Sequence, residues 1–236
     1  MLELENIYVS TGGREILRDI NLRVNAGETA VLFGPNGSGK TTLLNTIMGI
    51  PPYLPSSGNI QLNGKNITTL DTDERARMGI GISFQKPPVV RGVKLGGFLD
   101  AISSEGWNSV DMARRLNLGG FLTRDLNNGY SGGEIKRSEL LQLQAQSPSF
   151  VMFDEPDSGV DLVSIKLIGR MINEMLHEKE RAGLLITHAG YILDYVDADI
   201  AYVMIQGHIM CAGKPKDILK DIREIGYKGC AHCQKD

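Results

Sequence analysis

The sequence Gly34-Pro35-Asn36-Gly37-Ser38-Gly39-Lys40-Thr41-Thr42 decides the fold. Its first eight residues fit the pattern G-x-x-x-x-G-K-[ST], between an apolar run that predicts a strand (28–33) and a segment that predicts a helix (39–48). The glycines let backbone N–H groups turn toward phosphate oxygens, and the helix N-terminus adds partial positive charge. An ordinary glycine-rich turn would not need the lysine and threonine. We therefore expect all nine residues to hold a nucleoside triphosphate, with Lys40 on the β- and γ-phosphates and the Thr41 hydroxyl on Mg²⁺.

A second stretch, Val151-Met152-Phe153-Asp154-Glu155, predicts a buried strand that ends in two acids. Open α/β sheets place ligands at the carboxyl ends of their strands. Asp154 is suited to the Mg²⁺ shell, and Glu155 to polarising an attacking water. Alone, two such acids are more often a simple acidic turn. The phosphate loop upstream favours the catalytic interpretation.

The rest of the chain predicts an α/β fold. Expected strands at 81–84, 150–153, 183–187 and 200–205 alternate with expected helices at 71–78, 161–180 and 191–195. This alternation is typical of a parallel sheet with helices on its faces. Between them, residues 86–129 predict two or three short amphipathic helices, including 95–102 and 110–116, and no strand. We expect this segment to be an inserted helical subdomain.

Composition narrows the function classes. The chain has 236 residues and a net charge of −3, which gives no broad electrostatic footprint for nucleic acid. The first residues lack a signal peptide, and no stretch reaches the roughly 18 apolar residues of a membrane helix. The cysteines, Cys211, Cys230 and Cys233, do not suggest a disulfide scaffold. We therefore expect a cytoplasmic protein whose membrane role, if any, comes through a partner.

The run Tyr130-Ser131-Gly132-Gly133-Glu134, just before a predicted helix, resembles the LSGGQ signature of the ATP-binding-cassette (ABC) ATPase family. A Ser hydroxyl and glycine amides at a helix start form a second nest for an anion, although a simple capped helix would look the same. In the family, this nest contacts the γ-phosphate of ATP bound to the opposing subunit. The resemblance assigns that role to Ser131 and Gly133.

Further marks of the family follow in the expected order along nearly the whole chain. Gln85 matches the glutamine that senses Mg²⁺ and the attacking water, and His188 matches the histidine that contacts the γ-phosphate. Ser158-Gly159-Val160-Asp161 resembles the loop that crosses the dimer interface. The resemblance thus implies catalytic roles for Glu155, His188 and Gln85, and metal contacts by Thr41, Gln85 and Asp154.

The resemblance also implies an architecture. We expect residues 1–236 to form one P-loop ATPase domain that works as an ATP-dependent, head-to-tail homodimer. Residues 1–85 and 145–236 would form the nucleotide-binding core with an antiparallel β subdomain. Residues 86–144 would form the helical subdomain that carries the signature.

Two departures from the family bear on specificity and partner. The aromatic residue that usually stacks on adenine is replaced, by spacing, by Thr11. The signature ends in Glu134 and continues to Lys136 and Arg137, which resembles SufC, the soluble ATPase of SUF iron–sulfur cluster assembly. A SufB-like scaffold protein is the partner that this resemblance implies. The alternative is the ATP-binding subunit of a membrane transporter, paired with a permease.

Three segments carry open hypotheses. Residues 87–90, beside Gln85, are either partner contacts or a rigid turn. Cys230-Ala231-His232-Cys233 has the ligand types of a metal site, but an exposed tail is the simpler interpretation. Lys136 is either a surface lysine or a latch that pairs with an acid near the active site and holds Glu155 away from water.

Overall fold

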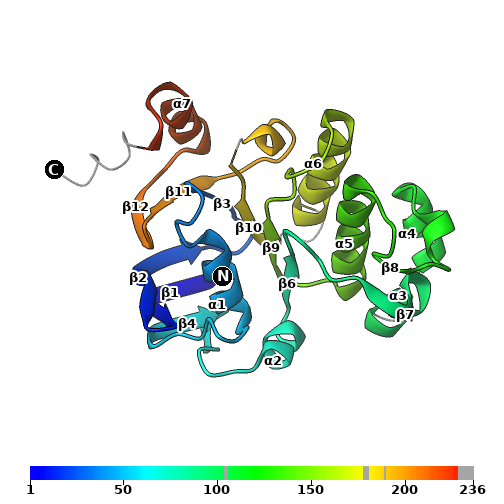
Figure 1. The fold of residues 1–236 in the computed structure, drawn as a ribbon, viewed down its shortest axis with the longest axis horizontal. Coiled ribbons are helices and arrows are strands. Elements are labelled where there is room, and N and C mark those ends of the chain that lie inside the picture. The colour runs from blue at the N-terminus through cyan, green and yellow to red at the C-terminus, as the bar shows by residue number, and fades with distance from the viewer. Residues whose placement is uncertain (104–105, 178–180, 189, 228–236) are drawn as a thin grey trace.

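The computed structural model describes residues 1–103, 106–177, 181–188 and 190–227. A central sheet of six strands, in the order β12-β11-β3-β10-β9-β6, runs through the middle of the molecule (Figure 1). Five of its strands are parallel, and β12 pairs antiparallel with β11 at one edge. The strands are β3 (Thr29–Phe33), β6 (Ile80–Ser83), β9 (Phe150–Asp154), β10 (Ala182–Ile186), β11 (Ile200–Ile205) and β12 (His208–Gly213). The α/β prediction is confirmed.

The two faces of this sheet lie in two different cores. Val31, Val151 and Leu185 point into one core, while their neighbours Ala30 and Met152 point into the other. This alternation follows from the period of two in a strand, and burial on both faces explains why β3, β9 and β10 read as apolar runs. Because both faces of the parallel sheet are covered, a ligand site is expected at the carboxyl ends of its strands.

One face is covered by the N-terminal third of the chain. An antiparallel sheet, in the order β2-β1-β4-β5, lies beside α1 (Lys40–Met48), as Figure 1 shows in blue and cyan. Its strands are β1 (Leu2–Thr11), β2 (Arg14–Val24), β4 (Ser57–Leu62) and β5 (Lys65–Asn66). The short helix α2 (Thr72–Arg77) follows, and it begins with a capping box at Asp71. The helices predicted at 39–48 and 71–78 are confirmed.

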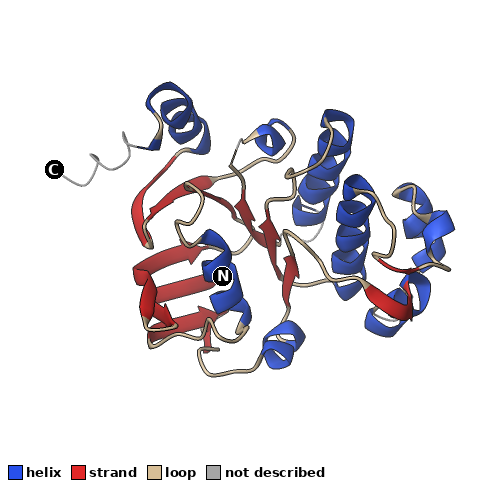
Figure 2. Ribbon diagram, viewed as in Figure 1, coloured by secondary structure: helices blue, strands red, loops and turns tan. Residues whose placement is uncertain are grey.

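The other face is covered by α5 (Gly132–Gln146) and α6 (Leu162–His177), which pack side by side (Figures 1 and 2). Beyond α5 lies the inserted subdomain, with α3 (Leu95–Ile102), α4 (Ser109–Arg115) and the 3-10 helix η1 (Gly119–Phe121). Since α5 is one continuous helix, the expected boundary at 144/145 falls inside it.

One expectation about the insertion is wrong. It contains two short antiparallel strands, β7 (Val90–Lys94) and β8 (Asp125–Leu126). Most of β7 is exposed, and it contains Gly92 at φ 82°. The sequence did not predict this strand because it has neither an apolar alternation nor an apolar run. The pairing joins the two ends of the insertion.

The C-terminal part adds the 3-10 helix η2 (Tyr191–Asp194) and α7 (Pro215–Ile225). The sequence reading did not include α7 or β12, although Pro215 at the first helical position and Gly226 after the last are helix-boundary signals. Across the described ranges, no helix has both the length and the apolar character needed to cross a membrane.

Candidate active site

The phosphate loop joins β3 to α1. Gly39, the residue before α1, has φ 107°, and a Cβ there would lie 2.9 Å from Leu17 Cδ2. Only glycine fits this combination of left-handed backbone and close packing. The loop is also held from outside, because Gly207 N–H donates to Ser38 O at 2.9 Å. The turn before β12 therefore supports the loop, a role that the sequence reading missed.

Lys40 lies at the centre of this loop, 5% exposed. Its Nζ donates to Gly34 O at 2.8 Å and to Pro35 O at 3.0 Å. Burial lowers the pKa of Lys40, while the nearby carboxylates of Glu155 and Asp154 raise it. The loop thus holds a desolvated ammonium group that is suited to phosphate oxygens.

Asp154, the last residue of β9, is 3% exposed. Burial raises the pKa of Asp154, and a hydrogen bond with the Thr41 side chain opposes that rise. Its Oδ1 has no hydrogen-bond partner among the described residues. A buried carboxylate oxygen without a donor, beside a threonine hydroxyl, is a hard oxygen pair of the kind that Mg²⁺ prefers. The residues present therefore fit a magnesium ion.

Glu155 follows with φ 50°, in the left-handed region, which costs a non-glycine residue about 1 to 2 kcal/mol. Its N–H donates to Ile186 O at 3.1 Å, which helps to hold this conformation. Its side chain accepts a hydrogen bond from Gln85 Nε2 at 2.5 Å and contacts His188 Nε2. The three residues expected to act in hydrolysis therefore meet.

The strand order explains this meeting. Gln85 follows β6, Glu155 follows β9 and His188 follows β10, and these strands are neighbours in the sheet. Because parallel strands end at the same edge, side chains just after them converge. Behind them, Thr187 Oγ1 donates to Asp157 Oδ2 at 2.8 Å, which ties the segment after Glu155 to the one that carries His188.

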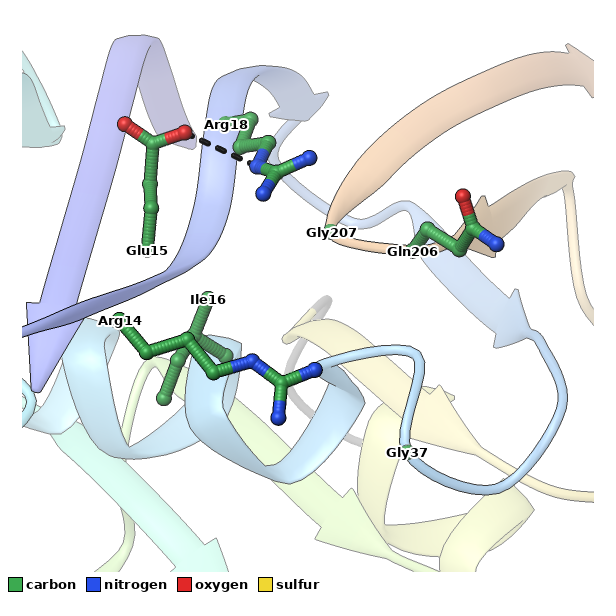
Figure 3. A pocket seen from close by; sticks show the side chains of 7 residues that line it. All are labelled: Arg14, Glu15, Ile16, Arg18, Gly37, Gln206 and Gly207. Carbon is green, nitrogen blue, oxygen red and sulfur yellow. Dashed lines mark ion pairs between the residues drawn. The ribbon is translucent and has the colours of Figure 1, made fainter.

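Two adjoining pockets open on the phosphate loop. The first, about 410 Å³, is lined by Ile16, Asn36, Gly37, Gly39, Lys40, Thr41, Thr42, Gln85 and Glu155. The second, about 520 Å³, is lined by Arg14, Glu15, Ile16, Arg18, Gly37, Gln206 and Gly207. Figure 3 shows the Arg14 side chain extending toward the loop that carries Gly37. Thr11, the position that by spacing replaces the adenine-stacking aromatic residue, pairs with Arg14 across the β1–β2 turn.

The signature segment lies elsewhere in the fold. Ser131 caps α5: its Oγ accepts from Glu134 N at 3.4 Å, and Glu134 Oε2 accepts from Ser131 N at 2.7 Å. Ser131 and Gly133 do not line either of the two pockets. A Cβ on Gly132 would lie 2.9 Å from Gly159 O, so this helix start packs on the segment expected to cross a dimer interface.

The chain matches known proteins over nearly its whole length. The family model described as "ABC transporter" matches residues 17–158. The chain belongs to the ABC transporter family. It is 37% identical to a probable ABC transporter ATP-binding protein of Streptococcus pyogenes serotype M3, over 98% of this chain and 95% of that protein. It is 36% identical to a probable ATP-dependent transporter, ycf16, of Cyanophora paradoxa, over 96% and 93%.

A solved structure, a nucleotide-free ATP-binding cassette from an ABC transporter, superimposes with a TM-score of 0.78 at 25% identity, covering 94% of each chain. The chain is thus an ATPase of the ABC family, and the fold class is the one expected. The P-loop, Gln85, Glu155 and His188 of this ABC ATPase lie together, whereas its signature does not join them within one chain.

Lys136 is 4% exposed, so the surface-lysine alternative is wrong. Its Nζ lies 3.2 Å from Glu139 Oε2, three residues along the same helix, so the acid that pairs with it is Glu139. The segment Cys230–Cys233 lies outside the described residues.

Proposed function

We propose that this ABC ATPase hydrolyses Mg-ATP with Glu155 as the residue that polarises the attacking water. The observation that carries the proposal is the contact of Glu155 with both Gln85 and His188 beside the phosphate loop. The water oxygen would bond to the γ-phosphorus as the bond to the β–γ bridging oxygen breaks. Its proton would pass toward Glu155, and the products would be ADP and phosphate.

Thr41, Asp154 and Gln85 would hold the magnesium ion, whose positive charge would offset the negative charge of the β- and γ-phosphates. Lys40 would move from the loop carbonyls to the phosphates. Ribose and base would extend into the adjoining pocket, against Ile16 and Arg14 (Figure 3). Removing Mg²⁺ with EDTA is expected to abolish hydrolysis. Turnover that persists in EDTA contradicts the metal assignment.

The working unit would be a head-to-tail homodimer in which Ser131 and Gly133 of a second copy close each site. Two facts support this: the signature helix start is exposed, and neither residue lines the P-loop pocket of its own chain. N–H groups at the start of α5 would complete the γ-phosphate shell. Because the phosphate would supply part of the interface, dimerisation is expected to depend on ATP.

For the partner, we propose a SufB-like scaffold and a role in iron–sulfur cluster assembly. The run from Ser131 to Arg137 supports this reading. A mostly apolar groove of about 370 Å³ is lined by Phe84, Pro87, Pro88, Val90, Phe98 and Ile102, among others, and would receive the partner. Val89 beside it is 53% exposed.

The names of the relatives favour a second candidate, the ATP-binding subunit of a membrane transporter. A pull-down with the Glu155→Gln variant and Mg-ATP, from native cytosol and from detergent-solubilised membranes, separates the two. Recovery of a soluble SufB-like scaffold supports the assembly role. Recovery of a polytopic membrane protein contradicts it and supports the transporter.

A further inference from the structure

The ion pair between Lys136 and Glu139 is almost fully buried, at 4% and 6% exposure. Burial raises the pKa of Glu139, and Lys136 opposes that rise. A buried ion pair is costly to desolvate, and apolar residues of similar size often stabilise a fold at least as well. The pair therefore calls for an explanation other than folding.

The contacts of the pair point to the segment that leads to Gln85. Glu139 Oε1 accepts from Phe84 N–H at 2.7 Å, and Glu139 Oε2 accepts from Ser83 Oγ at 3.1 Å. Lys136 Nζ donates to Phe84 O and, at 3.4 Å, to Gln85 O. Both backbone groups of Phe84 are thus held by one face of α5. These charge-assisted bonds fix the main chain just where β6 ends.

The chain of contacts then continues to the catalytic carboxylate. From this fixed backbone, Gln85 Nε2 reaches Glu155 Oε2 at 2.5 Å. Lys136 and Glu139 themselves lie on α5, whose N-cap is Ser131 of the signature. The buried pair therefore lies between the signature and Glu155, and it links them through side chains and backbone of named residues.

We propose that Lys136 and Glu139 are positioning residues for hydrolysis, which hold the backbone of Phe84 and Gln85 so that the Gln85 amide stays on Glu155. Neither residue touches the nucleotide. Any rotation of α5 at the signature end would carry Gln85 with it. The proposal rests on the role proposed above for Gln85.

The test compares four proteins by steady-state ATP hydrolysis and by ATP binding: wild type, Gln85→Ala, Lys136→Met/Glu139→Leu, and the triple variant. The double variant removes both charges, so no uncompensated charge remains in the core and the fold is retained. Circular dichroism and thermal unfolding check this. Lys136→Arg is the conservative control, because it keeps the charge and the donors.

We expect the double variant to lower kcat roughly 10- to 100-fold, since a misplacement of about 1 Å can cost about 100-fold, with the Kd for ATP unchanged. Lys136→Arg is expected to keep most of kcat. In the Gln85→Ala background, the double substitution is expected to add little, because both changes act on the same contact.

Three outcomes contradict the proposal in different ways. If Gln85→Ala keeps the wild-type kcat, the proposed role of Gln85 fails and the proposal falls with it. If Gln85→Ala lowers kcat but the double variant does not, the function stands and the positioning role is wrong. If the losses multiply in the triple variant, the pair acts independently of Gln85, which also overturns the proposal.

Discussion

The phosphate loop and the carboxylate that it faces are built in opposite ways. The loop is one run of residues, 34–42, whose shape follows from its glycines and from the start of α1. The neighbours of Glu155 come from three separate segments and meet only because β6, β9 and β10 lie side by side. The residues that bind ATP are therefore close together in the sequence, whereas the residues that act in hydrolysis are brought together by the order of the strands in the sheet. Substitutions in the loop should change Kd, and substitutions around Glu155 should change kcat.

The largest effect is expected for Glu155→Gln. General-base assistance contributes about 100- to 10,000-fold, so kcat should fall within that range. The Kd for ATP should stay close to wild type, because the loop is untouched. Single-turnover hydrolysis and equilibrium ATP binding measure the two quantities. Glu224→Gln, on the exposed face of α7, is the matched control. Undiminished hydrolysis would remove Glu155 from the catalytic role.

Lys40→Ala should weaken the binding of ATP by the phosphate loop. A hydrogen bond to a charged group contributes about 1.5 to 3 kcal/mol, so the Kd for ATP should rise roughly 10- to 100-fold. Isothermal titration with a non-hydrolysable ATP analogue measures this change. Lys65→Ala, in the exposed strand β5, controls for loss of charge. An unchanged Kd contradicts the phosphate-loop assignment.

Thr11→Tyr should strengthen nucleotide binding. An aromatic contact is worth about 0.5 to 1.5 kcal/mol, which corresponds to a Kd for ATP roughly 2- to 10-fold lower, with kcat unchanged. Thr11→Val, which adds no ring, is the control. A Kd that stays the same or rises would mean that the base does not lie beside position 11.

The smallest effect is expected at Asp157, which helps to join the Glu155 and His188 segments. Burial raises its pKa, and the hydrogen bond from Thr187 opposes that rise. The native state then holds the proton more tightly than the unfolded chain. The stability that this carboxyl contributes is therefore fully present below its unfolded pKa and lost as pH rises through its folded pKa.

Urea unfolding of wild type and Asp157→Asn across this pH range measures the effect. Asparagine does not titrate, so the stability of wild type relative to the variant should fall with rising pH. Asp221→Asn, at an exposed position, is the control for removal of a carboxylate. A difference that stays constant or grows with pH contradicts the assignment.

The same contrast explains what the sequence could predict. The loop, α1 and the buried strands carry strong local patterns, and the structure confirms them. That Gln85, Glu155 and His188 converge followed from the family resemblance. Local patterning contains no information on strand order. The short strands β7 and β8 were missed because β7 is mostly exposed and has no apolar pattern, while β8 has only two residues.

The pairing of Lys136 with Glu139 also could not be predicted from the sequence. Glu139 lies three residues away, a spacing that permits a pair on any helix. Its burial, and its bonds to the end of β6, depend on how α5 packs on the sheet. Likewise, the contact of Gly207 with the phosphate loop joins positions far apart in sequence.

The central claim is that each hydrolytic site combines the phosphate loop of one copy with the signature of another. The most direct test mixes Lys40→Ala and Ser131→Asp at an ATP concentration near the wild-type Kd, where Lys40→Ala binds little ATP and both variants are expected to be inactive alone. The second keeps an N-cap residue on α5 but places a negative charge against the γ-phosphate, and Ser131→Asn is its neutral control. Mixed dimers would contain one site with both parts intact. We predict that the mixture hydrolyses ATP although neither variant does so alone. A mixture as inactive as its components would contradict the account.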